Sequence, residues 1–169
     1  MKESLVMTLI GKDRPGLVQS LSTLIEEHGG NWEASRMVHL AGEFAGLLSI
    51  EVDASRTDAL KEALGGLEGV TVTVTRAQGE REQEGTVRLM EVVAQDRPGI
   101  VRQVTATIAE LGLNIDELET EVTSAPMSAE LHFKATARLW GADAAAFDTL
   151  PDRLENLGAE LMVDLKTED

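Results

Sequence analysis

The chain of 169 residues contains no cysteine and no tyrosine, and it has only three phenylalanines and two tryptophans. Without cysteine it can form no disulfide framework, no thiolate nucleophile and no thiolate metal site. A chain without disulfides is compatible with a reducing compartment. Because aromatic residues are so scarce, the core must be built from leucine, valine, isoleucine, alanine and methionine.

Long apolar runs are also missing. The apolar run near the N-terminus, within residues 1–11, is far too short to span a membrane and is not followed by a signal-peptide cleavage pattern. No run of about 18 apolar residues occurs later in the chain. We therefore expect no membrane partner and a cytoplasmic location.

Positive charge is the third scarce feature. The chain has 15 lysines and arginines against 30 aspartates and glutamates, which gives a formal net charge of −15. Binding to nucleic acid depends on clustered lysine and arginine side chains that neutralise phosphates, and here the basic residues are scattered. The composition predicts that this protein does not bind DNA or RNA directly.

Motifs for catalysis or metal binding are not evident. The histidines, His28, His39 and His132, do not have the spacing of metal ligands. The many carboxylates lack a partner motif that would single out an acid and a base. We therefore expect no metal, no cofactor and no enzymatic activity.

What the sequence does contain is an internal repeat. The stretch GKDRPGLV, which begins at Gly11, returns 83 residues later as AQDRPGIV, and residues 13–37 and 96–120 are identical at nine of 25 positions. The identical pairs are Asp13/Asp96, Arg14/Arg97, Pro15/Pro98, Gly16/Gly99, Val18/Val101, Ile25/Ile108, Glu27/Glu110, Gly29/Gly112 and Asn31/Asn114. Residues 77–85, AQGEREQEG, lack an apolar period and are typical of a linker. We predict a first unit over residues 1–80, with the rest of the linker and the second unit in residues 81–169.

The residue patterns predict the same order of elements in both units. In the first, we expect strands at residues 5–10, 32–40, 46–53 and 70–75, and helices at 15–28 and 57–67. In the second, we expect strands at 86–94, 115–123, 129–139 and 161–165, a helix at 98–111 and a helical region up to 157. Because proline is tolerated in the first turn of a helix but not in its interior, we predict that this last helix starts at Pro151.

Residues 129–139 alternate between apolar and polar side chains, as expected for a strand with one dry face and one wet face. The order β-α-β-β-α-β with such strands predicts an α+β fold. It consists of two ferredoxin-like βαββαβ units, each an antiparallel sheet with its helices on one face.

The repeated DRPG turn has a structural interpretation. An aspartate near a helix start accepts hydrogen bonds from free backbone N–H groups, proline is preset for a first turn, and glycine permits a tight entry into the helix. This interpretation leaves the matching Asn31 and Asn114 unexplained.

A functional interpretation uses the same chemistry. A helix N-terminus presents free N–H groups that can hold a carboxylate, while Asp13 can face an ammonium group. Asn31 carries both a donor and an acceptor, and we expect it to reach the same end of the sheet as the turn. Donors for a carboxylate beside acceptors for an ammonium predict a receptor for a free α-amino acid.

At these residues the sequence resembles the ACT-domain family of small-ligand sensors. The resemblance consists of DRPGLV with GGNWEASR and of DRPGIV with GLNIDELE, each within a βαββαβ pattern, and the two units cover nearly the whole chain. It implies amino-acid binding at the loop after the first strand and at the start of the second strand, generally at an interface between two domains. The implied ligand-binding residues are Asp13, Gly16, Leu17 and Asn31 in the first unit, and Asp96, Gly99, Ile100 and Asn114 in the second. Trp32, which aligns with Ile115, departs from the family pattern.

A pair of such domains without a catalytic domain looks most like the glycine cleavage system transcriptional repressor group, and the segment TSAPMSAELHF at residues 123–133 adds to this similarity. The resemblance implies a non-enzymatic regulator that senses an amino acid such as glycine. Its implied partner is a protein, either a DNA-binding transcriptional activator or a metabolic enzyme. A structural interaction module with vestigial pockets is the alternative. The sequence leaves open whether the units pair within one chain or across a homodimer.

Overall fold

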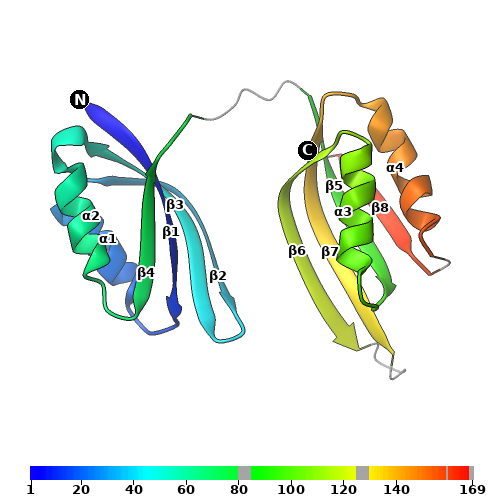
Figure 1. Ribbon diagram of the computed structural model, residues 1–169, viewed down its shortest axis with the longest axis horizontal. Coiled ribbons are helices and arrows are strands. Elements are labelled where there is room, and N and C mark those ends of the chain that lie inside the picture. Colours follow the sequence, from blue (N-terminus) through cyan, green and yellow to red (C-terminus); the bar gives the residue numbers. More distant parts are fainter. Residues whose placement is uncertain (80–84, 125–129, 159, 168–169) are drawn as a thin grey trace. The chain divides into compact units, whose positions relative to one another are not determined.

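The computed structural model describes residues 1–79, 85–124, 130–158 and 160–167. The chain divides into two compact units, Met1–Glu80 and Arg81–Asp169. Each unit is a four-stranded antiparallel sheet with two α-helices on one of its faces (Figure 1). The predicted fold class, two ferredoxin-like units of order βαββαβ, is confirmed.

The first sheet has the strand order β2-β3-β1-β4. Its strands are β1 (Lys2–Lys12), β2 (Asn31–Leu40), β3 (Glu43–Asp53) and β4 (Val70–Arg76). The helices are α1 (Leu17–Glu27) and α2 (Thr57–Gly65), and the short 3₁₀ helix η1 (Ala54–Arg56) precedes α2. The central strand β1 pairs with β3 on one side and with β4 on the other, so the turn that leaves β1 lies in the middle of one sheet end.

The second sheet repeats this arrangement with the order β6-β7-β5-β8. Its strands are β5 (Thr86–Gln95), β6 (Asn114–Ser124), β7 (Leu131–Gly141) and β8 (Met162–Thr167), and its helices are α3 (Ile100–Glu110) and α4 (Ala145–Glu155). Part of the predicted linker, residues 80–84, and part of the TSAPMSAELHF segment, residues 125–129, lie outside the described residues.

Each unit has a separate aliphatic core between its sheet and its helices. Alternate residues of the central strands point into it: Leu5, Met7 and Leu9 in β1, and Met90, Val92 and Ala94 in β5. Full burial of one such large aliphatic side chain contributes about 1.5–3 kcal/mol, so these cores supply most of the favourable free energy of folding.

The prediction that the last helix starts at Pro151 is wrong. Helix α4 begins at Ala145, and Pro151 lies inside it. An interior proline removes one backbone hydrogen bond and costs about 3 kcal/mol. Phe147, Leu150 and Leu154 on the same helix are almost completely buried, and about 1.5–3 kcal/mol from each of them outweighs that cost.

Candidate functional site

The two DRPG segments form the same β-turn. The N–H of Leu17 donates to the carbonyl oxygen of Arg14 at 3.3 Å, and the N–H of Ile100 donates to that of Arg97 at 3.3 Å. Gly16 and Gly99 occupy the third turn position with φ of 82° and 88° and with ψ near zero. A proline followed by a residue with these angles is a type II turn, which strongly favours glycine at its third position. This geometry explains why the Pro-Gly pair is repeated.

The capping role of the aspartates in the structural interpretation is wrong. Gly16 and Gly99 hold the N-cap positions of α1 and α3, and neither helix start receives a side-chain cap. The carboxylates of Asp13 and Asp96 accept no hydrogen bond from any residue that the structure describes. They are therefore available to a ligand.

The other predicted residues of the turns differ in exposure. Leu17 and Ile100 are only 4% and 3% exposed, because both side chains are buried on the core side of their units. Asp13 is exposed and Asp96 is half-buried. The backbone N–H of Asp96 donates to the carbonyl oxygen of Leu131 at 2.8 Å, which ties the second turn to the start of β7.

Within one unit, the prediction that the asparagine reaches the same sheet end as the turn is wrong. Lys12, next to the first turn, pairs with Glu43, whereas Asn31 pairs with Glu51. Gln95, next to the second turn, pairs with His132, whereas Asn114 pairs with Trp140. Glu43 and Glu51 are eight residues apart on β3, and His132 and Trp140 are eight residues apart on β7, which is roughly 27 Å of strand in each unit.

The physical reason lies in the connection between the two strands. Helix α1 or α3 carries the chain back along the sheet, so the following strand begins at the end opposite to the turn. The structure therefore brings Asp13, Gly16 and Leu17 together at one end of the first sheet and leaves Asn31 at the other. The same separation holds between Asp96, Gly99 and Ile100 and the distant Asn114.

Asn114 has a structural partner within its own strand. Its Nδ2 donates to Oδ1 of Asp116 at 2.9 Å, and Oδ2 of Asp116 accepts from Nη1 of Arg138 at 3.0 Å. Asp116 stands at the irregularity where the pairing of β6 with β7 shifts between Ile115 and Glu117. The first sheet has the same shift between Trp32 and Ala34, with Glu33 in the place of Asp116. Asn114 thus helps to hold a bulge that both units share.

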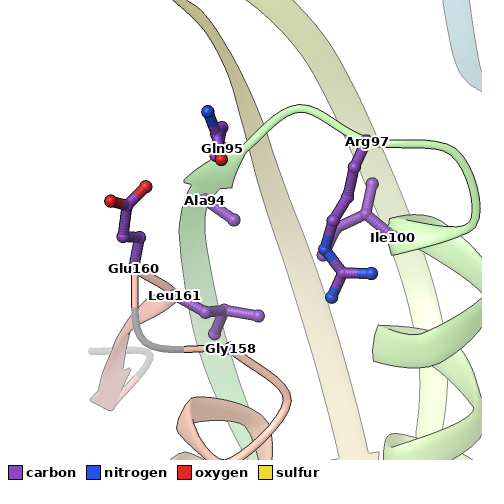
Figure 2. A pocket seen from close by; sticks show the side chains of 7 residues that line it. All are labelled: Ala94, Gln95, Arg97, Ile100, Gly158, Glu160 and Leu161. Atoms are coloured by element: carbon purple, nitrogen blue, oxygen red, sulfur yellow. The ribbon is translucent and has the colours of Figure 1, made fainter.

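A pocket of about 270 Å³ opens beside the second turn. It lies between the end of β5, the turn and the segment that joins α4 to β8 (Figure 2). Its lining residues are Ala94, Gln95, Arg97, Ile100, Gly158, Glu160 and Leu161. Ile100 is therefore the one predicted site residue that lines this pocket.

Arg97 forms one wall of the pocket. Its Nη2 donates to Oε1 of Gln103 at 2.6 Å and lies 3.4 Å from the carbonyl oxygen of Leu157. These bonds join the turn to α3 and to the segment after α4, and they hold the guanidinium in place. In Figure 2 the side chain of Arg97 runs from the turn along Ile100, and Glu160 stands at the opposite side of the pocket.

The first unit differs at the corresponding place. A Cβ added to Gly11, which aligns with Ala94, would lie 2.3 Å from the carbonyl oxygen of Gly69, so the α2–β4 segment rests directly on β1. The methyl group of Ala94 prevents such an approach in the second unit. The segment that joins the second helix to the last strand is also one residue longer in the second unit. Leu161 follows Leu157 by four positions, whereas Val70 follows Leu67 by three. These two differences account for the open space.

Sequence reasoning missed most of the pocket. Arg97 belongs to the repeated motif, but its alignment with Arg14 does not indicate that its side chain reaches the segment after α4. Gly158, Glu160 and Leu161 follow α4, where the two units share no motif. Their contribution depends on tertiary packing, which no local pattern reports.

Over residues 1–79, 85–124, 130–158 and 160–167, no three His, Asp or Glu side chains gather to hold a metal ion. No helix within these same ranges is both long enough and apolar enough to cross a membrane.

Comparison with known proteins gives consistent results. Two models of the ACT domain match the chain, one over residues 3–75 and the other over residues 88–134. The glycine cleavage system transcriptional repressors of Escherichia coli K12 and Shigella flexneri are each 28% identical over 178 aligned positions, which cover 98% of this chain and 93% of theirs.

Solved structures agree over the whole chain. A crystal structure described as that of an unknown protein from Galdieria sulphuraria is 29% identical, with a TM-score of 0.84 and full coverage of both chains. Another, described as a candidate glycine cleavage system transcriptional repressor, is 18% identical with a TM-score of 0.70 and 99% coverage of both chains, which supports the fold.

Proposed function

Because the chain belongs to the ACT-domain family, we propose that it is a non-enzymatic regulatory protein that binds an amino acid and passes the signal on by contact with another protein. The observation that carries the proposal is the pair of ACT units, which resembles the bacterial repressors over 98% of the chain. Glycine is the first candidate ligand, because the relatives are named for glycine cleavage.

The two turns support a ligand site in each unit. Each turn holds an aspartate whose carboxylate accepts no hydrogen bond from a described residue, beside the backbone N–H groups at the start of a helix. Such N–H groups can bind the carboxylate of an amino acid, and the aspartate can face its ammonium group. We propose ligand sites at Asp13, Gly16 and Leu17 in the first unit and at Asp96, Gly99 and Ile100 in the second.

The open face of the first sheet supports a protein partner. Ile10 pairs with Ala45, and Ala45 pairs with Val38, so the three form one row on the side away from the helices. Ile10, Val38 and the nearby Leu47 are 52%, 57% and 50% exposed. Clustered exposed apolar side chains often mark a surface that another protein covers. We propose a DNA-binding transcription regulator as that protein, since the relatives are named transcriptional repressors.

A thermal-shift panel with the twenty amino acids tests the proposal. A ligand at 100 times its dissociation constant stabilises a folded protein by about 2.7 kcal/mol, which is readily measured. Binding is then measured by calorimetry for Asp13→Ala and Asp96→Ala, with the exposed Thr23→Ala on α1 as control. Loss of a charge-assisted contact should weaken binding by about 1–3 kcal/mol in the aspartate variants alone. If no amino acid shifts the melting temperature of the parent chain, the alternative function is favoured, an interaction module with vestigial pockets.

A further inference from the structure

We propose that the pocket beside the second turn, lined by Ala94, Arg97 and Glu160 among others, binds an aliphatic α-amino acid of about the size of leucine. The choice of an amino acid rests on the proposed function. The site itself requires neither of the two asparagines and no second unit, because all of its lining residues belong to one unit.

The size and the floor of the pocket indicate an aliphatic side chain. Its floor consists of Ala94, Ile100 and Leu161, which are 5%, 3% and 6% exposed. A pocket of about 270 Å³ has room for a whole amino acid of the size of leucine. The side chain of leucine would cover the apolar floor, whereas glycine would leave much of it uncovered.

Arg97 supplies the donors for a carboxylate. The guanidinium has five N–H donors in a fixed plane, and its recorded hydrogen bonds to Gln103 and Leu157 use only Nη2. No described residue accepts a hydrogen bond from Nε or Nη1. A cation that is anchored on one side and unpaired on the other is well suited to bind a carboxylate.

Glu160 and Gln95 supply acceptors on another part of the rim. An ammonium group of the ligand can face the carboxylate of Glu160 and the side-chain oxygen of Gln95. A carboxylate at the mouth also repels a doubly charged anion such as phosphate. The combination of one cation, one anion and an apolar floor therefore selects a zwitterion with an aliphatic side chain.

Ligand analogues test each contact on the full chain by calorimetry. The probes are L-leucine, 4-methylpentanoate, which lacks the ammonium group, isoamylamine, which lacks the carboxylate, and glycine. We expect one leucine bound per chain, and roughly tenfold weaker binding for 4-methylpentanoate and isoamylamine because each loses a charge-assisted contact. Glycine should also bind more weakly, because it leaves the apolar floor uncovered. Equal affinities for leucine and both truncated analogues would overturn the proposal.

Filling the pocket gives a second test. A Cβ at Gly158 would lie 4.0 Å from Nη2 of Arg97 and meet no closer atom, so Gly158→Val should fold and occupy the space. Its control is Gly66→Val after α2, where the nearest atom to an added Cβ lies at 3.4 Å. Gly158→Val should weaken leucine binding at least tenfold with an unchanged melting temperature, and Gly66→Val should leave the affinity unaltered.

Replacing Glu160 separates the ammonium contact from the rest. Glu160→Gln should weaken leucine binding several-fold but should not weaken 4-methylpentanoate binding, while Glu68→Gln in the first unit changes neither affinity. Unaltered leucine affinity in both Gly158→Val and Glu160→Gln, or no leucine binding by the parent chain, overturns the pocket site. Amino-acid binding that survives Gly158→Val but is lost in Asp13→Ala or Asp96→Ala would leave the proposed function intact and refute only this inference.

Discussion

The two DRPG turns are alike in sequence and backbone, yet their surroundings differ. Gly16 and Gly99 adopt nearly the same angles, and both turns close with a 3.3 Å hydrogen bond. Beside the first turn, Gly69 rests directly on Gly11, whereas Ala94 and a longer segment leave a pocket beside the second. The repeated motif thus fixes the shape of the turn, and residues outside the motif decide whether a pocket forms next to it.

The comparison of the two turns predicts that Gly11→Ala has the largest effect on the free energy of unfolding. The new methyl group would lie 2.3 Å from a backbone oxygen, so the α2–β4 segment must move, and we expect a loss of about 1–3 kcal/mol or more in the free energy of unfolding of the first unit. Gly65→Ala, the same change at an uncrowded helix position, should instead stabilise that unit by up to about 1 kcal/mol.

Denaturant titration of the full chain measures both effects. Each unit contains one tryptophan, Trp32 or Trp140, so the fluorescence of Trp140→Phe reports on the first unit and that of Trp32→Phe on the second. An unchanged transition of the first unit in Gly11→Ala would show that the segment does not rest on the strand.

The two turn glycines should respond equally to substitution. Gly16→Ala and Gly99→Ala place a Cβ in open space, so only the left-handed backbone conformation opposes them, at about 1–2 kcal/mol each. The same fluorescence titration checks this expectation. A difference of more than about 1 kcal/mol between the two variants would contradict the equivalence of the turns.

Alanine substitution of the two turn arginines should have different effects on stability. Arg97→Ala removes the hydrogen bonds to Gln103 and Leu157 and should destabilise the second unit by about 1 kcal/mol. The side chain of Arg14 is exposed and makes no hydrogen bond or ion pair with a described residue, so Arg14→Ala should leave the stability of the first unit unchanged. Equal losses of stability in the two units would mean that the arginine acts through the turn and not through its hydrogen bonds to Gln103 and Leu157.

The smallest expected effect is a pH dependence at the start of η1. The backbone N–H and the hydroxyl group of Ser55 donate to Asp53, and these bonds lower the pKa of its carboxyl group below the ordinary value. A lowered pKa contributes stability above the unfolded-state value, and this contribution is lost as the pH falls through the folded-state value. Carboxyl NMR titration should show Asp53 protonating at a lower pH in the parent chain than in Ser55→Ala, and identical midpoints would contradict it.

The fold could be predicted largely from the sequence, because its causes are local. Alternation in the strands, helical spacing of Leu17, Leu21 and Ile25, and the repeated turn all act within a few residues. The prediction was wrong where a distant contact outweighed a local rule. Pro151 lies inside α4 because buried neighbours on that helix outweigh the lost hydrogen bond.

The candidate site was harder to predict, since it depends on where chain segments meet. The repeat identified the turns correctly, but it gave no information on the length of strand between a turn and its asparagine. Nor did it indicate that Arg97 reaches Leu157 or that Glu160 stands opposite. These relations arise from strand register and from the lengths of the segments after α2 and α4.

The most direct test of the central claim is an NMR titration of the isotope-labelled full chain with each of the twenty amino acids. The claim that this protein is an amino-acid sensor predicts that at least one amino acid shifts the backbone amide signals of Gly16 or Gly99 in a saturable manner. Asp13 or Asp96 should respond together with them, because each belongs to the same turn as the corresponding glycine. If none of the twenty shifts any of these signals at millimolar concentration, the repeated turn has only a structural role and the proposed function is wrong.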